Sequence, residues 1–202
     1  MLMFGLPPNT IVNQTLTKKA FHEKFNLRTV ERERFDADIS RMTIMAEISP
    51  NRIPALVKGK EIEVLYVLQV VLKRKEYDTK NILLLQKLIP QNIVFALQYD
   101  GSTQLCIFHT RLQQSEWMPS DEAIIPLQGL NLDDVWNNIV ASIGGLDAAS
   151  EETIEQQIIN REQKERLLRQ IEVLEKKCRL EKQTHKKYEL HQELLKLKSL
   201  IQ

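Results

Sequence analysis

The chain of 202 residues is 43% hydrophobic and 27% charged, with a formal net charge of +1 at pH 7. These proportions are ordinary for a soluble globular protein, and a net charge near zero excludes a general electrostatic attraction to nucleic acids or membrane surfaces. Two isolated cysteines, Cys106 and Cys178, exclude a disulfide framework and a cysteine-rich zinc site, and they are typical of a reducing compartment such as the cytoplasm.

We find no segment that would direct the chain into or across a membrane. Residues 1–8 lack the basic region and the apolar stretch of a signal peptide. The most apolar run, residues 64–72, is far shorter than the roughly 20 residues needed to cross a bilayer. We therefore expect a cytoplasmic protein that has no membrane partner.

Two helices are expected in the first fifty residues. Thr17 is placed to cap a helix that runs to Phe25, because its hydroxyl oxygen can accept a hydrogen bond from a backbone N–H of the first turn. Thr29 is placed to cap a second helix, which should end before Pro50. In this second segment the apolar residues that recur at helical spacing are Phe35, Ile39 and Met42.

The strongest strand prediction falls on residues 61–73. Apolar side chains occupy both alternating faces of this run, so the strand should lie inside a sheet that is covered on both sides. A helix should follow it, starting at Asp78 or Thr79 and ending near Pro90, because the proline ring cannot continue a helix.

A β-hairpin is predicted next, because residues 93–99 and 105–109 alternate between apolar and polar side chains around Asp100-Gly101. This dipeptide favours a tight turn, since glycine adopts positive φ without a side-chain clash. A further strand is expected at residues 123–127. Asn131 or Asp133 should cap one more helix, which Gly144-Gly145 would close.

The order of these elements, ααβαβββα, predicts an α+β (mixed α/β) globular domain over residues 1–146. It would contain a small sheet with a β-hairpin, flanked by helices. Residues 146–150 are interpreted as a linker to a helical C-terminal tail at residues 151–202.

The tail contains no Gly and no Pro, and its apolar residues return every three or four positions through a charged background. Such stripes do not stay exposed to water, so the tail must pack on a partner, on itself or on its own domain. Cys178 ends the first stripe. The stripe residues that we predict to bind a protein partner are Leu167, Ile171, Leu174, Leu190, Leu194, Leu197 and Ile201.

The two stripes are separated by residues 179–189, where Leu180 and Tyr188 are the large apolar residues. Two apolar halves around a polar middle predict an α-helical hairpin or a coiled-coil-like tail, or one long helix that touches different surfaces. A continuous dimeric coiled coil is less favoured, because heptads are not sustained over three to four repeats.

Basic residues cluster in the middle of the tail, and clustered Lys and Arg on a helix are the electrostatic footprint of nucleic-acid binding. The alternative is that this cluster has no binding role and forms a solvated helix face, with ion pairs such as Glu172 with Lys176. The candidate nucleic-acid-binding residues are Lys176, Lys177, Arg179, Lys182, Lys186 and Lys187.

The sequence contains no catalytic constellation that supports a specific reaction. The histidines lack metal-ligand spacing, and we find neither a glycine-rich phosphate-binding loop nor a nucleophile elbow, so no cofactor and no metal are expected. One acidic set could hold Mg²⁺ in a nuclease of the restriction-endonuclease type, namely Glu61, Glu63 and Asp78 with Lys80. Solvated charges at a strand end and at a helix N-terminus explain these residues more simply, so the nuclease is the less favoured interpretation.

Short motifs along the chain resemble a bacterial family, domain of unknown function 4391. The opening motifs are Met3-Phe4-Gly5-Leu6-Pro7, Lys18-Lys19 and Phe25; the middle ones are Glu61-Ile62-Glu63-Val64, Ile89-Pro90 and Glu116-Trp117. The closing ones are Leu174-Glu175-Lys176-Lys177, Glu181-Lys182-Gln183 and residues 187–190. The resemblance covers nearly the whole chain.

This resemblance implies no activity and no catalytic residue. It does imply that the gene neighbours those of helicases and DNA methyltransferases in restriction-like or antiphage defence loci. With the apolar tail, it predicts a non-catalytic accessory or scaffold subunit that docks on a helicase or DNA methyltransferase, or a homo-oligomer formed through the tail. The alternatives are a DNA-binding protein that uses the basic segment and a Mg²⁺-dependent nuclease.

Overall fold

A computed structural model describes residues 3–147, 149–150 and 152–200, and the chain divides into two compact units, Met1–Ser150 and Glu151–Gln202. Two short 3-10 turns, Met3–Gly5 and Pro8–Thr10, open the first unit. Its strands are β1 (Ile11–Leu16), β2 (Ile39–Ile48), β3 (Leu65–Leu72), β4 (Asn92–Tyr99), β5 (Ser102–His109), β6 (Arg111–Gln114) and β7 (Met118–Pro119). Its helices are α1 (Lys18–Phe25), α2 (Thr29–Asp38), α3 (Lys80–Leu88) and α4 (Leu132–Gly144); the second unit has α5 (Ile154–Leu180) and α6 (Thr184–Ser199).

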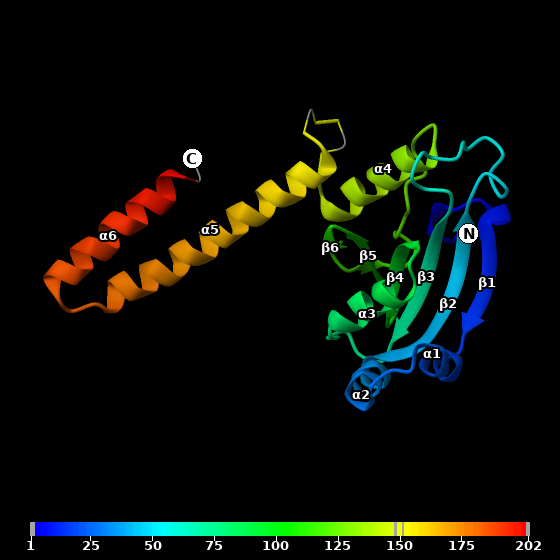
Figure 1. The fold of residues 1–202 in the computed structure, drawn as a ribbon, viewed down its shortest axis with the longest axis horizontal. Coiled ribbons are helices and arrows are strands. Elements are labelled where there is room, and N and C mark those ends of the chain that lie inside the picture. The colour runs from blue at the N-terminus through cyan, green and yellow to red at the C-terminus, as the bar shows by residue number, and fades with distance from the viewer. Residues whose placement is uncertain (1–2, 148, 151, 201–202) are drawn as a thin grey trace. The chain divides into compact units, whose positions relative to one another are not determined.

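The strands form one mixed sheet in the order β1-β2-β3-β4-β5-β6, with β7 paired to β5 (Figure 1). β3 and β4 are parallel and are joined through α3, whereas the other neighbouring pairs are antiparallel. The predicted α+β class with C-terminal helices is therefore confirmed. None of the described helices is both long and apolar enough to cross a membrane.

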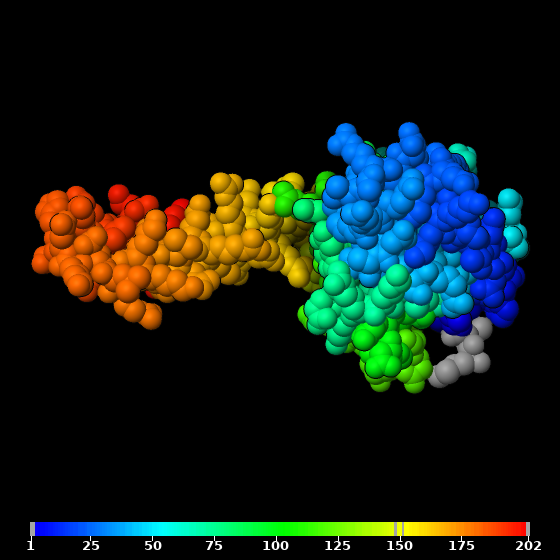
Figure 2. All heavy atoms as spheres, turned by 90° about the horizontal axis from the view of Figure 1, so that it is seen from below, coloured from blue at the N-terminus to red at the C-terminus, as the bar shows by residue number. Residues whose placement is uncertain are grey.

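β3 lies in the middle of this sheet, between β2 and β4, as its two apolar faces predicted. On one face its side chains join a core to which α1, α2 and α3 contribute. The buried members of that core are Phe21, Leu27, Phe35, Ile39, Met42, Leu68, Val70, Leu72, Ile82, Leu84, Leu85, Ile93, Phe95, Leu97 and Cys106. Figure 2 looks onto the end of the unit where α1 and α2 lie, and their atoms form a continuous surface there.

α4 packs against the opposite face of the sheet. Its Trp136 is 4% exposed, and the indole Nε1 donates a hydrogen bond to Nδ1 of His109 on β5, 3.2 Å away. The strand residues buried on this face include Val94, Ala96, Leu105 and Ile107. The sheet is therefore covered on both sides, as the composition of β3 requires.

Several predicted boundaries depend on caps and turns. The Thr29 cap is wrong, because Thr29 is the first residue of α2 and Arg28 is its N-cap. The following caps and turns are confirmed. The Thr17 hydroxyl oxygen accepts from the N–H of Ala20 at α1, and the Asn131 side chain accepts from Asp134 at α4. Gly145, with φ of 61°, ends α4. Asp100 and Gly101 both have positive φ in the turn between β4 and β5, which is the geometry of a tight hairpin turn.

The predicted helix through Ile39 and Met42 is wrong, because α2 ends at Asp38 and the following residues form β2. A register shift between Ile39 and Arg41 allows Ile39 and Met42, which are three positions apart, to face the same core. This β-bulge therefore imitates helical periodicity in the sequence. Residues 123–127 are not a strand, and β1, an edge strand with little alternation, was missed.

The predicted strand at residues 61–73 begins only at Leu65, because the residues before it bind α4 instead. The Asp133 carboxylate accepts hydrogen bonds from the backbone N–H groups of Lys60 (2.6 Å), Glu61 and Ile62 (3.0 Å). Burial alone would raise the pKa of Asp133, but these donors outweigh it and hold the pKa below its usual value. A Cβ atom at Gly59 would overlap the Asp133 carboxylate, so only glycine fits there.

A second carboxylate with several hydrogen bonds, the buried Asp38, joins α2 to the start of α3. Its side chain is 1% exposed and accepts hydrogen bonds from Arg74 Nε, the Asp78 backbone N–H and Asn81 Nδ2, each at 2.8 Å. Arg34 Nε in turn donates to Asn81 Oδ1 at 3.2 Å. A buried charge is tolerated only when it is paired and hydrogen-bonded in this way.

We expect the Asp38→Ala variant to lose about 3 kcal/mol of unfolding free energy, because the substitution removes the acceptor of the Asp78 N–H and of Arg74, and one of the two acceptors of Asn81 Nδ2. Urea denaturation at neutral pH measures the loss. Asp36→Ala is the matched control. Asp36 is 41% exposed and pairs with Lys18, so its removal should change the free energy by less than about 1 kcal/mol. Equal urea midpoints for the two variants would contradict the role given to Asp38.

Candidate docking site

The second unit is a helical hairpin whose helices are α5, of 27 residues, and α6, of 16 residues. The Thr153 hydroxyl oxygen caps α5 by accepting from the N–H of Gln156 at 3.2 Å. Residues 181–183 form the turn, in which the Glu181 side chain accepts from the N–H of Gln183 at 2.8 Å. The turn falls within the polar stretch that separates the two apolar stripes, so the helical-hairpin prediction is confirmed.

The two apolar stripes of the tail pack against each other. Ile171 and Leu174 of α5 and Leu194 of α6 are buried, and the partly buried Leu190 and Leu197 pack on them. Leu167 and Cys178 are half-buried. Ile201, the last residue predicted in these stripes, lies outside the described residues.

The hairpin therefore uses five of the predicted partner-binding residues for its own closure, namely Ile171, Leu174, Leu190, Leu194 and Leu197. The binding of the predicted residues to another protein stays a prediction. The stripes did not predict which apolar residues the closed hairpin would leave exposed. They are Ile159, Leu168, Val173, Leu180, Tyr188, Leu195 and Leu200, with exposed fractions from 42% to 78%. In the sequence these residues can be recognised as apolar residues outside the two stripes. Whether they stay exposed depends on how α5 and α6 pair, which the sequence does not give.

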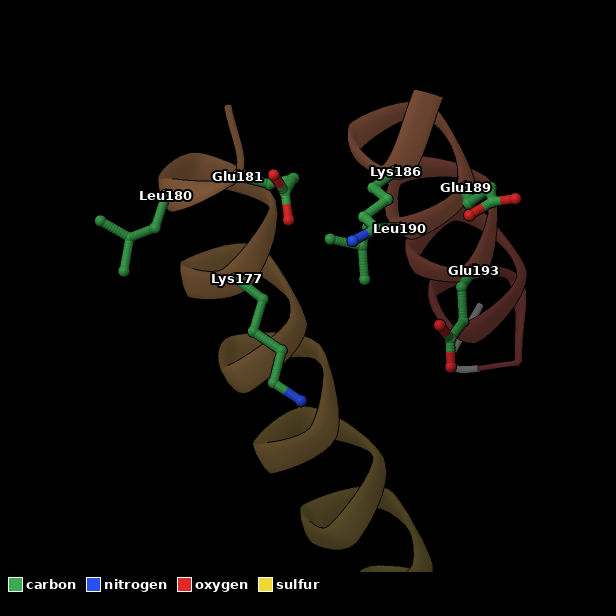
Figure 3. A pocket seen from close by; sticks show the side chains of 7 residues that line it. All are labelled: Lys177, Leu180, Glu181, Lys186, Glu189, Leu190 and Glu193. Atoms are coloured by element: carbon green, nitrogen blue, oxygen red, sulfur yellow. The ribbon is translucent and has the colours of Figure 1, made fainter. Parts of the chain in front are cut away.

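One side of the hairpin carries an open groove of about 600 Å³ between α5 and α6 (Figure 3). We call this side the groove face. In Figure 3 the Lys177 side chain of α5 extends toward α6, whereas Leu180 points away from it. The residues that line the groove are Lys177, Leu180, Glu181, Lys186, Glu189, Leu190 and Glu193.

The opposite side, which we call the back face, is defined by Leu168, Tyr188 and Leu195. At 100° per residue these positions lie on the far side of each helix from the groove residues. An ion pair between Glu175 and Lys198, 2.7 Å apart, connects α5 to α6 on this side. Tyr188 and Leu195 are seven residues apart, so their side chains lie close together along α6.

The predicted basic segment lies around the turn of the hairpin, at the end of α5 and the start of α6. Lys176 forms an ion pair with Glu172 at 2.8 Å, and this hydrogen bond lowers the pKa of Glu172. Glu181 and Glu189 stand among the other basic residues, and Glu189 also lies 3.4 Å from His185. The structure gathers all six predicted residues at one end of the hairpin but mixes them with carboxylates.

The acidic residues considered for a nuclease are not brought together. Glu61 and Glu63 precede β3 and Asp78 follows it, so a strand of about 26 Å separates them. Glu63 forms an ion pair with Lys58, whereas Asp78 accepts from the N–H of Lys80 at 2.9 Å. Within the part of the chain that the structure describes, no group of three or more His, Cys, Asp or Glu residues could hold a metal ion.

Comparison with known proteins identifies the chain at the level of the family. A family model described as Domain of unknown function (DUF4391) matches residues 4–200, which is nearly the whole chain. This match confirms the resemblance that the short motifs indicated. No curated protein and no solved structure matches the chain.

We expect Leu194→Ala to destabilise the hairpin by roughly 2–4 kcal/mol, because it removes a buried side chain from the contact between α5 and α6. The neighbouring Leu195→Ala is the matched control, since Leu195 is 49% exposed and its loss leaves no cavity. Hydrogen–deuterium exchange of the full chain checks both variants. Faster exchange in α5 and α6 is expected for Leu194→Ala only, and equal exchange in the two variants would contradict the hairpin core.

Proposed function

Since the chain belongs to the family described as Domain of unknown function (DUF4391), we propose that it is a non-catalytic accessory or scaffold subunit of a bacterial restriction-like or antiphage defence system. In this role it docks on a helicase or DNA methyltransferase of the same system. The choice of partner rests on the genomic setting that the family resemblance implies, and the docking role rests on the hairpin.

The observation that carries this proposal is the apolar surface that remains after the hairpin has closed. Tyr188 is 64% exposed and Leu195 is 49% exposed on one side of α6, and Leu168 is 49% exposed on α5. Apolar residues at helical spacing are the usual anchors of helix-mediated protein contacts, and Tyr is enriched among the residues that contribute most to binding. We therefore assign the back face to the protein partner.

The ion pair on the back face fits the same role. Glu175 and Lys198 place one charge of each sign beside the apolar positions, and protein interfaces commonly combine apolar side chains with paired polar groups. Such a surface favours a protein partner over a nucleic acid, which would require a surplus of basic residues.

Nucleic-acid binding is the second candidate function, and the position of the basic segment favours it. Lys182, Lys186 and Lys187 are exposed and lie together at the turn of the hairpin. Phosphate contacts by such residues release counterions, so the affinity should fall steeply as salt is added. The interspersed Glu181 and Glu189 oppose this reading, and for that reason it stands second.

The test of the docking role is co-purification of the tagged full chain with the helicase or methyltransferase that its own operon encodes. We expect Tyr188→Asp with Leu195→Asp to abolish recovery of the enzyme, because each charge is placed in the apolar centre of the contact. Val30→Asp is the control, since Val30 is equally apolar and 72% exposed but lies on α2 in the first unit. Recovery that is unchanged by the double substitution would exclude the back face.

For the second candidate, we expect binding to a fluorescent DNA duplex at low salt to be lost in a variant with Lys182, Lys186 and Lys187 changed to Glu. Fluorescence anisotropy at increasing salt measures the affinity and its salt dependence. The control changes Lys19, Lys24 and Lys87 to Glu, which alters the net charge equally in the first unit. If neither duplex nor single-stranded DNA binds the wild-type chain at low salt, this function is excluded.

A further inference from the structure

We propose that the groove face of the hairpin binds the groove face of a second copy of this chain, so that the two hairpins form a four-helix bundle. The pairing does not depend on the docking role proposed above, because it uses the opposite side of the hairpin. It is favoured by charge, by the positions of exposed apolar residues and by the small size of the hairpin core.

The charges of the groove face are arranged so that the face is complementary to itself. Lys177 stands on the α5 side of the groove, and Glu189 and Glu193 stand on the α6 side. A two-fold axis parallel to the helices places α5 of one copy over α6 of the other, with every neighbouring pair of helices antiparallel. Lys177 of each copy then faces Glu189 and Glu193 of the other.

The apolar residues of the same face follow this arrangement. Val173 is 52% exposed and Leu180 is 78% exposed, and because they are seven residues apart they lie on one side of α5. On α6 the half-buried Leu190 lines the groove, and Leu200, 68% exposed, lies on the same side. The contact of α5 with α6 of the second copy therefore joins apolar side chains between the charged pairs.

The core of a single hairpin is small for a unit of this length. Among the described residues, the cluster between α5 and α6 has three buried members, Ile171, Leu174 and Leu194, with Leu190 and Leu197 at its edge. Small helical units commonly gain further burial by oligomerisation. A second copy would cover Leu190 and extend this cluster into the interior of a bundle.

The balance of charge favours a second copy over a strongly charged partner. The groove carries Lys177 and Lys186 against Glu181, Glu189 and Glu193, so both signs are present in nearly equal number. An acidic or a basic peptide would meet as much repulsion as attraction on such a surface. A copy of the same face, rotated by 180°, places Lys177 of each chain opposite Glu189 and Glu193 of the other.

The experiment is sedimentation equilibrium of the full chain, followed by charge exchange. We expect the wild-type chain to sediment with twice the mass of one chain. Lys177→Glu should weaken the dimer on the order of a hundredfold, because it places carboxylates opposite Glu189 and Glu193, and the variant with Glu189→Lys and Glu193→Lys should weaken it similarly. An equimolar mixture of the two variants should restore a dimer that contains one copy of each.

Restored dimerisation in the mixture cannot reflect a general change in folding stability, since each variant carries the same substitutions in the mixture as it does alone. A monomeric wild-type chain would overturn the proposal, and so would a dimer that neither variant weakens. Capture of a helix from another protein in the groove of a monomeric chain would overturn it too. Tyr188→Asp with Leu195→Asp should leave the dimer intact, so failure of the docking role and failure of the pairing are separate results.

Discussion

The apolar character of both faces of β3 is the constraint on which the first unit depends. A strand that is apolar on one face can lie against water, but β3 requires a layer of helices on each side of the sheet. α1, α2 and α3 supply one layer and α4 supplies the other. Polar groups at the helix ends then need partners. The buried Asp38 carboxylate accepts from the Asp78 N–H and from Asn81 Nδ2, and the partly exposed Asp133 carboxylate accepts from the backbone of residues 60–62.

A similar constraint operates in the hairpin, where the pairing of α5 with α6 decides which apolar residues remain available. The buried stripes hold the two helices together and leave two exposed sides of different character. The back face has a tyrosine and leucines with an ion pair, which fits a different protein. The groove face has charges of both signs around leucines, which fits a second copy. In the two roles proposed above, one small element would join a partner enzyme and a second copy at once.

Local signals in the sequence predicted the local features of the structure. The Thr17 and Asn131 caps, the turn at Asp100-Gly101 and the break between the two tail stripes all depend on residues close together in the chain. The features that were missed depend on partners far away. The bulge in β2 is defined by pairing with β3, and the early residues of the predicted central strand bind Asp133, more than seventy residues later. The same holds for the candidate site, because the stripes of α5 and α6 could be predicted individually but the exposed side chains that flank them could not.

The contact between Gly59 and Asp133 has a consequence for the order in which the chain becomes structured during synthesis. The segment before β3 has its N–H groups satisfied by a carboxylate at the start of α4, and Val57 also pairs with Asn131 there. A nascent chain that ends before residue 131 therefore holds this segment without its anchor, even when β1 to β5 have already left the ribosome. The segment becomes ordered only when α4 emerges, so folding of the first unit is completed late, by residues near its C-terminal end.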